Sequence, residues 1–254
     1  APEAGSRAAA TYLRRWFAPA ALRELLAYRH LIESQGYGCQ ALLKVILSRA
    51  ARSARLTTHF ALDFPARPQR EPYWCRKHSR HCLPTTSALK FLKRYSLDTL
   101  RRLDAFAAVR TSATVAVQHA DSRHAPLPRI DGVITSPPYV GLIDYHEQHA
   151  YAYHLLGLPE QRAAEIGGPA AGAGAAARQQ YQHDVAQVFR RATAAMPSGG
   201  RLIVVANDSA NLYDQIAAMA GVEVEAVVQR HVNRRTGLRA GDFYESVFIW
   251  RKPG

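Results

Sequence analysis

The chain has 254 residues, 48% of them hydrophobic, which is enough for one large domain or two small domains with a proper core. No apolar stretch approaches the length of a membrane span, and no signal peptide opens the chain. Its three cysteines are too few for a disulfide framework, so we expect a cytoplasmic protein. The first residue is Ala1, which indicates a chain that is processed, cut or numbered from inside a longer protein.

The formal net charge of +13 is unevenly placed along the chain. Residues 1–110 hold 20 Lys and Arg against 7 Asp and Glu, whereas residues 111–254 hold 13 of each. A basic segment beside a neutral one indicates a polyanion that is held by the first and processed by the second. The alternative is a high-arginine genome that scatters charge over solvated helix faces, and composition alone favours that alternative.

Residues 1–110 form a basic helical region, which we expect to contact DNA. Apolar spacing predicts helices over residues 19–33 and 39–53, an irregular segment over 54–84, and a long helix over 86–108. One face of the long helix is basic, and contact with phosphates and simple solvation are equally good interpretations of it. The basic residues are Lys90, Lys93, Arg94, Arg101 and Arg102.

Residues 111–254 change to the pattern of an α/β domain. Strands are predicted over residues 114–117, 131–135, 201–206, 222–230 and 243–252. Helices are predicted over residues 144–156, 178–195 and 211–220, the second preceded by a loop of small residues. This order suits a parallel α/β sheet closed by an antiparallel hairpin.

The most informative segment reads Asp-Gly-Val-Ile-Thr-Ser-Pro-Pro-Tyr over residues 131–139. Proline cannot donate to a strand ladder, so the strand must end before Pro137 and release a loop at its carboxyl end. Open α/β sheets place their active sites at such strand ends. The hydroxyl of Ser136, the carbonyls stiffened by two prolines and the ring of Tyr139 suit the binding of a planar base that carries an exocyclic amino group.

The Ser-Pro-Pro-Tyr tetrapeptide after an apolar strand resembles the catalytic motif of the amino-group DNA methyltransferases. These enzymes transfer methyl from S-adenosylmethionine to cytosine N4 or adenine N6 in DNA, and serine in first place is more typical of the cytosine-N4 enzymes. The resemblance implies that Ser136 Oγ and the Pro137 carbonyl bind the amino hydrogens, while Pro138 stiffens the loop and Tyr139 stacks on a base flipped out of double-stranded DNA. The alternative is an ordinary proline turn with Tyr139 as packing.

The order of elements from residue 111 resembles the second half of a class I methyltransferase fold. The resemblance places Asp121 near the adenine of the cofactor, because that family carries an acidic residue after its third strand. The Pro-Ser-Gly-Gly turn over residues 197–200 and the closing hairpin also match, and residues 10–110 resemble a helical insertion that some members carry.

The family's cofactor motif, an aromatic-x-Gly-x-Gly turn after the first strand, is absent from the sequence. The two strands that would lie between strand 114–117 and strand 131–135 are missing with it. We therefore expect an upstream segment or a second polypeptide to supply them. A non-catalytic nucleic-acid-binding subunit of a split methyltransferase remains an alternative function.

Two basic segments are the predicted DNA contacts. They contain Arg76, Lys77 and Arg80 in the first region and Arg234, Arg235 and Arg239 in the turn of the closing hairpin. The first lies within the pattern Cys75-x-x-His78-x-x-His81-Cys82. Four ligands within eight residues do not easily surround one tetrahedral ion, so we expect no metal there and interpret the segment as a phosphate-binding loop.

Polar residues after the predicted strands could also contribute to a pocket. Asp144 and Tyr145 follow the Ser-Pro-Pro-Tyr loop, and His146 and His149 are interpreted as polar lining. Asn207 and Asp208 end the strand over residues 201–206, where a substrate contact and a turn cap are equally good interpretations.

Overall fold

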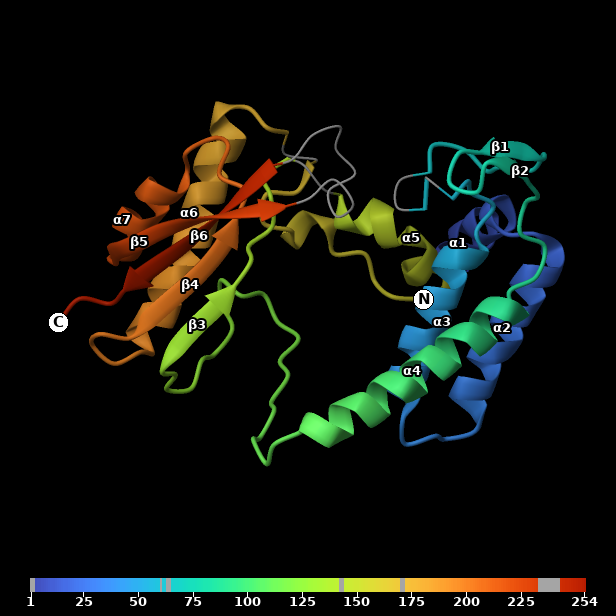
Figure 1. Cartoon of the computed structure of the whole chain (residues 1–254), viewed down its shortest axis with the longest axis horizontal. Helices are drawn as coiled ribbons and strands as arrows, with labels where there is room; N and C mark the ends of the chain where they lie inside the picture. Colours follow the sequence, from blue (N-terminus) through green and yellow to red (C-terminus); the bar gives the residue numbers. More distant parts are fainter. Residues whose placement is uncertain (1–2, 60, 63–64, 142–143, 170–171, 233–242) are drawn as a thin grey trace. The chain divides into compact units, whose positions relative to one another are not determined.

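The structure, a computed structural model, describes residues 3–59, 61–62, 65–141, 144–169, 172–232 and 243–254. The chain divides into two compact units, which are considered separately below (Figure 1). The first contains residues 1–114 and 145–160, and the second contains residues 115–144 and 161–254. The helix that follows the Ser-Pro-Pro-Tyr loop therefore belongs to the basic unit.

The first unit is built from helices. They are α1 (Glu3–Trp16), α2 (Pro19–Ser34), α3 (Gln40–Ala54), α4 (Leu89–Val109) and α5 (Tyr145–Leu156). The predictions for α2 to α5 are confirmed within a few residues, while α1 was not predicted. The core that joins them contains Phe17, Leu25, Leu47 and Leu155, all at most 1% exposed.

Only part of the predicted apolar face of helix α4 is buried in this core. Leu92 is buried, but Leu100, Leu103 and Phe106 are 56%, 43% and 58% exposed. The periodicity therefore predicted the helix, while burial depended on which turns have a packing partner. None of the helices in the described part of the chain is long and apolar enough to cross a membrane.

A small hairpin interrupts the segment between α3 and α4, which the sequence predicted to be irregular. Strand β1 (Tyr73–Cys75) pairs antiparallel with β2 (Arg80–Cys82), with Tyr73 opposite Cys82 and Cys75 opposite Arg80. Each strand has only three residues. Two strands this short are marginally stable by themselves, so the hairpin depends on its side-chain contacts.

The second unit is an α/β domain. Its strands β3 (Gly132–Thr135), β4 (Arg201–Ala206), β5 (Glu223–Val232) and β6 (Phe243–Arg251) form one sheet in the order β3-β4-β6-β5. Strands β3 and β4 are parallel, and β6 is antiparallel to both of its neighbours. The predicted parallel sheet closed by an antiparallel hairpin is thus confirmed for these strands.

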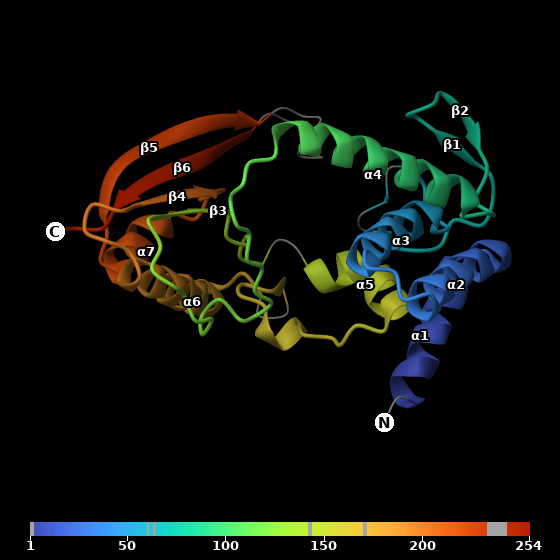
Figure 2. The same ribbon diagram turned by 90° about the horizontal axis from the view of Figure 1, so that it is seen from below.

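Helices α6 (Ala175–Ala194) and α7 (Tyr213–Ala220) lie on one face of this sheet (Figure 2). A short 3₁₀ helix, η1 (Arg162–Ala164), precedes them. The core between the helices and the sheet is rich in aromatic rings: Phe189 meets Trp250 edge-on with centroids 5.3 Å apart, and Tyr213 stacks on Phe248 at 4.9 Å. Such ring pairs add to the apolar area that they bury.

The predicted strand over residues 114–117 is wrong, because no residue between 111 and 119 is in a strand. Val115 and Val117 are 82% and 89% exposed. In the described residues β3 pairs with β4 alone, and Ile134 on β3 is 81% exposed. A β-branched segment becomes a strand only when a neighbour completes its ladder, and the part of the chain that the structure describes offers none to residues 114–117.

The Pro-Ser-Gly-Gly turn sets the start of β4 against the start of β3. Gly199 has a φ of +78°, which glycine adopts without the steric cost that other residues meet. A Cβ on Gly200 would lie 3.1 Å from the Asp131 carbonyl oxygen and 2.8 Å from Met196 Cε. Both glycines are therefore needed for the close approach that aligns the two parallel strands.

Candidate functional site

The segment Ser136–Tyr139 leaves the carboxyl end of β3 as an extended loop, as its prolines require. Strand β4 runs parallel to β3 and ends beside it at Ala206, so Asn207 and Asp208 follow at the same edge of the sheet. Ser136 is exposed, while Pro137, Pro138 and Tyr139 are half-buried. The loop thus presents its hydroxyl outward and anchors the rest.

Two tyrosines fix the middle of this loop. The hydroxyl of Tyr181, on α6, donates a hydrogen bond of 2.8 Å to the Pro138 carbonyl. The Tyr213 hydroxyl, on α7, lies 2.8 Å from the Tyr181 hydroxyl and donates to it, because the Tyr181 proton is already committed. Burial, followed by the neighbouring Tyr181, raises the pKa of Tyr213 far above its ordinary value, so this donor stays protonated.

A buried carboxylate fixes the end of the loop. Tyr139 Oη donates a 2.8 Å hydrogen bond to Glu245 Oε1 on β6. Glu245 is 8% exposed and its other oxygen pairs with Arg230 on β5. The ring of Tyr139 is therefore held in one place by the antiparallel hairpin. This contact was not predicted from sequence, because Glu245 lies more than a hundred positions away in the chain.

A cavity of about 110 Å³ lies directly against the anchored end of the loop. Its lining consists of Tyr139, Val140, Tyr181, Asn207, Asp208, Ser209, Ala210, Leu212 and Tyr213. Pockets for drug-sized ligands measure roughly 300–1,000 Å³, so this cavity has room for a small group and not for a nucleoside cofactor.

Asp208 serves as a helix cap. Its carboxylate accepts hydrogen bonds from the backbone N–H groups of Leu212 and Tyr213, at 2.7 and 3.2 Å, at the start of α7. Such a cap satisfies donors that the helix itself leaves unpaired. Burial raises the pKa of Asp208 and these hydrogen bonds oppose the rise. Of the two interpretations of this residue, the structure bears out the turn cap.

Asp121 is engaged by a neighbour within its own turn. Both of its carboxylate oxygens accept from the guanidinium of Arg123, at 2.7 to 3.1 Å, and Arg123 also pairs with Asp184 on α6. Hydrogen bonds from Arg123 lower the pKa of Asp121 to about 2. The carboxylate that the resemblance assigned to the cofactor is therefore an ion-pair partner in the structure, and the Arg123 contact was not predicted.

The side chains of Arg76, Lys77 and Arg80 are exposed on the hairpin of the first unit. Beside them lies a hollow of about 830 Å³ that the hairpin shares with α4. Its cationic lining residues are Lys77, Arg80, Lys90 and Arg94, and none of the described residues that line it is acidic. Two basic segments that are separate in the sequence thus form one positively charged surface.

The remaining predicted residues belong to other elements or make other contacts. His146, which is buried and packs on Tyr153, and His149 belong to α5 of the first unit, as does Tyr145. Asp144 pairs with Arg162 at 2.9 Å. The predicted DNA contacts Arg234, Arg235 and Arg239 lie outside the described residues.

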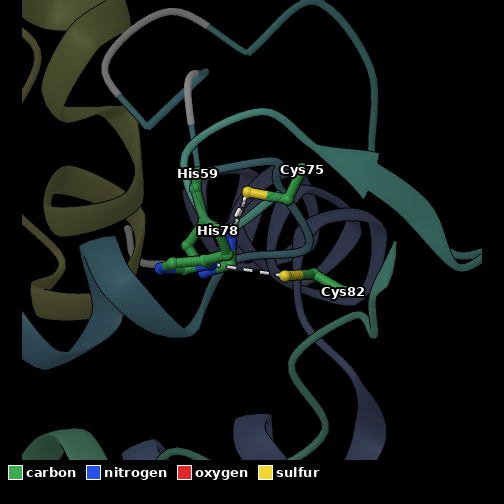
Figure 3. Close-up of side chains that lie close together, drawn as sticks. All are labelled: His59, Cys75, His78 and Cys82. Atoms are coloured by element: carbon green, nitrogen blue, oxygen red, sulfur yellow. Dashed lines mark hydrogen bonds between the residues drawn. The ribbon is translucent and has the colours of Figure 1, made fainter. Parts of the chain in front are cut away.

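The segment with two cysteines and two histidines folds differently from its linear pattern. Cys75, His78 and Cys82 converge, but the fourth residue of the cluster is His59, from the segment after α3 (Figure 3). His81 packs instead against Trp74, with ring centroids 5.4 Å apart. Burial, and then the neighbouring His78, Lys77 and Lys90, lower the pKa of His59 from its ordinary value. His59 was missed because nothing in the local pattern joins it to Cys75.

Comparison with known proteins gives one relative with a described activity. The chain is 34% identical to the type II methyltransferase M.MjaII of Methanocaldococcus jannaschii over 254 residues, which cover 93% of this chain and 48% of that protein. The chain thus spans about half the length of this relative. No family model matches the chain.

Solved structures resemble it only weakly. A protein of Thermus thermophilus described as a DNA modification methylase, TTHA0409, has a TM-score of 0.32 and 20% identity, over 53% of this chain and 52% of its own. TrmN from Thermus thermophilus has a TM-score of 0.29 and 18% identity, over 65% of this chain and 33% of its own.

Proposed function

We propose that this chain is the catalytic portion of a site-specific DNA methyltransferase that modifies the exocyclic amino group of a flipped base, with cytosine N4 as the acceptor. The observation that carries the proposal is the Ser136–Tyr139 loop at the carboxyl end of β3, anchored by Tyr181 and Glu245. The 34% identity to the type II methyltransferase M.MjaII supports it. An ordinary proline turn would need neither anchor.

Each residue of the loop has a different proposed contact with the base. Tyr181 occupies the Pro138 carbonyl, and within the described residues no donor binds the Pro137 carbonyl. The Pro137 carbonyl and Ser136 Oγ then accept the two amino hydrogens of the base and draw its nitrogen lone pair out of conjugation. The ring of Tyr139, held by Glu245, stacks on the flipped base, which costs a few kcal/mol to remove from the duplex.

The methyl donor of this reaction is S-adenosylmethionine, and the described residues do not form a site for it. The cavity of about 110 Å³ is too small, and Asp121, the residue proposed to meet the adenine, pairs with Arg123 in the structure. We infer that the cofactor site, with its Gly-x-Gly turn, is completed by sequence outside this chain, from an upstream segment or a second polypeptide. The exposed Ile134 and the edge of β3 that no described strand covers support this inference.

The first unit supplies affinity for double-stranded DNA. Lys77 and Arg80 on the hairpin and Lys90 and Arg94 on α4 line one hollow, where they neutralise phosphates. Such contacts position the duplex without specifying the base. Because its substrate is DNA, the protein works in the cytoplasm.

The test is nucleoside mass spectrometry of DNA from cells that express the chain together with the segment that completes its cofactor site. We expect N4-methylcytosine, and its absence from cells that carry Ser136→Ala. N6-methyladenine instead would make adenine the acceptor, the nearest alternative. Unmodified DNA despite stable expression and DNA binding would favour the non-catalytic subunit, an alternative that the occupied Asp121 carboxylate supports.

A further inference from the structure

Four potential metal ligands meet in the first unit. They are His59, Cys75, His78 and Cys82, and their ligand atoms all lie within 4.8 Å of one another. Figure 3 shows the four side chains directed at one point between them. Both cysteines are buried, and neither forms a disulfide.

The distances match the edges of a tetrahedral site. Cys75 Sγ lies 3.4 Å from His59 Nδ1 and 3.6 Å from His78 Nδ1, and His78 Nδ1 lies 3.4 Å from Cys82 Sγ. Zinc binds sulfur at about 2.3 Å and imidazole nitrogen at about 2.0–2.1 Å, which at tetrahedral angles separates the two ligand atoms by about 3.5 Å. The side chains therefore already stand at the spacing that one ion requires.

The hairpin register explains which residues belong to the cluster. Cys75 and Cys82 share one face of the hairpin, whereas Trp74 and His81 are paired on the opposite face. Adjacent residues of a strand point to opposite sides, so His81 cannot join Cys82. His78 reaches the cluster from the turn, where its backbone N–H donates to the Cys75 carbonyl at 3.1 Å.

His59 supplies the distant ligand that the linear pattern lacks. The Tyr73 hydroxyl accepts a hydrogen bond from the His59 backbone N–H at 3.2 Å and lies 2.7 Å from His59 Nδ1, so it holds this segment beside the hairpin. A neutral imidazole binds a metal ion through the ring nitrogen that carries no proton. The objection that four ligands within eight residues cannot surround an ion no longer applies, because one ligand comes from a separate segment.

We propose that His59, Cys75, His78 and Cys82 bind one structural zinc ion. Two thiolates and two neutral imidazoles select zinc among the common divalent ions and leave the site with no net charge, which suits its basic surroundings. Four protein ligands close the coordination sphere, so the ion stabilises the fold and takes no part in chemistry. It joins the segment after α3 to a hairpin too short to be stable alone. This proposal does not depend on the proposed function.

Metal content and cobalt spectroscopy on the full chain test the proposal. The purified protein should contain one zinc per chain by plasma mass spectrometry. Replacement by cobalt should give intense ligand-field bands of tetrahedral geometry and a sulfur-to-cobalt charge-transfer band. A wild-type chain that is folded in the presence of zinc and yet holds none, or whose cobalt spectrum is octahedral, would overturn the proposal.

A pair of histidine variants separates the structure from the linear pattern. His59→Ala should lose the tetrahedral spectrum and weaken zinc binding by orders of magnitude, whereas His81→Ala should keep one zinc per chain. Cys39→Ser, which removes an exposed thiol outside the cluster, is the matched control for Cys75→Ser and Cys82→Ser. The opposite result for the two histidines would assign the site to the linear pattern and sink the proposed ligand set.

The variant His59→Cys distinguishes loss of a ligand from misfolding, either of which could explain loss of metal in His59→Ala. This substitution should retain one metal ion and strengthen the charge-transfer band by about half, because three thiolates then bind the cobalt instead of two. An unchanged band in a folded, metal-loaded His59→Cys protein would show that position 59 is no ligand.

Discussion

At the scale of residues, the site depends on groups that hold the Ser136–Tyr139 loop as much as on the loop itself. Tyr181 fixes the Pro138 carbonyl, and Glu245 fixes the hydroxyl of Tyr139. Each anchor comes from a different element, so the loop would keep its shape before the base of the proposed reaction binds. Preorganised groups of this kind stabilise developing charge without reorganising during the reaction.

Variants of the loop should separate these roles in the protein with its complete cofactor site. Ser136→Ala should lower the rate of methyl transfer by roughly 10²–10³-fold, the usual cost of removing one preorganised polar group. Tyr139→Ala should be comparably damaging, whereas Tyr139→Phe keeps the stacking ring but loses the hydrogen bond to Glu245 and should give an intermediate rate. Single-turnover rates and circular dichroism provide the measurements, with the exposed Ser198→Ala as control. Full activity of Ser136→Ala or Tyr139→Ala would remove the loop from the mechanism.

Asp121 should make the free energy of unfolding depend on pH. Hydrogen bonds from Arg123 lower its pKa from an ordinary value of 3.8 to about 2. A lowered folded-state pKa stabilises the protein fully above the ordinary value, and this stabilisation is lost as the pH falls through about 2. Denaturant titrations of wild type and Asp121→Asn should therefore differ by a constant free energy of unfolding between about pH 7 and 5, begin to approach each other below about pH 4, and meet near about pH 2.

The control for this pH series is Asp131→Asn. Asp131 is exposed and makes no ion pair in the described part of the chain. Its variant removes one exposed carboxylate without removing an ion pair of the described residues. A gap for Asp121→Asn that stays constant down to pH 3 would show that the carboxylate is not titrating as its Arg123 contacts require.

At the scale of elements, the β1–β2 hairpin has two proposed roles, metal binding and DNA binding. One face holds the cysteines of the proposed zinc site, and the connecting turn exposes Arg76 and Lys77. An ion that fixes the hairpin also fixes the spacing of these cations. Under these two proposals, order in the hairpin and binding of phosphates would be coupled, and each can be measured separately.

Neutralising the hairpin should change how DNA binding responds to salt. Replacing Arg76, Lys77 and Arg80 with Gln should weaken binding and lower the slope of log K against log salt by about one for each lost phosphate contact. Fluorescence anisotropy over a salt series provides the measurement. Arg178→Gln with Arg190→Gln, two positions on α6 in the other unit, is the control. An unchanged slope in the triple variant would make the hairpin a solvated surface only.

Removing zinc should loosen the hairpin before the helices. A chelator that competes for zinc should speed amide exchange over Tyr73–Cys82 by orders of magnitude, because local opening no longer has to break metal–ligand bonds. The amides of α2 and α3 should change little, since their core does not contain the cluster. Hydrogen–deuterium exchange mass spectrometry resolves the two regions, and Cys82→Ser should show the fast exchange with or without chelator.

At the scale of the whole molecule, the sheet of the second unit has an edge, at β3, that no described strand covers. In the described residues β3 has a single neighbour, and the segment that was expected to lie beyond it, residues 114–117, is in no strand. The proposed cofactor site would lie at that edge. The basic unit, by contrast, has its own core and its own proposed metal site.

The chain alone should bind S-adenosylmethionine poorly or not at all. The aromatic-x-Gly-x-Gly motif whose turn would meet the methionine end is absent, and Asp121 pairs with Arg123. A single remaining contact is worth about 1–3 kcal/mol at best. Isothermal titration calorimetry should show no binding to this chain and micromolar binding once the missing segment is added. Micromolar binding to the chain by itself would contradict the inferred missing half.

The sequence by itself determined the features that depend on local chemistry. Helical spacing predicted α2 to α5, and the prolines after Thr135 required β3 to end where the loop begins. The apolar, β-branched runs after residue 200 predicted β4 and the two strands of the closing hairpin. These predictions succeeded because each depends on neighbours within a few turns of helix or one strand.

Only the tertiary structure decided which distant groups meet. Residues 114–117 have the composition of a strand and are none, since a ladder needs a partner. Glu245 reaches Tyr139 because sheet pairing brings β6 to the site. His59 replaces His81 in the cysteine cluster, because strand alternation turns His81 away while the chain after α3 returns to the hairpin. Contacts between segments far apart in the chain leave no local pattern, so folding alone reveals them.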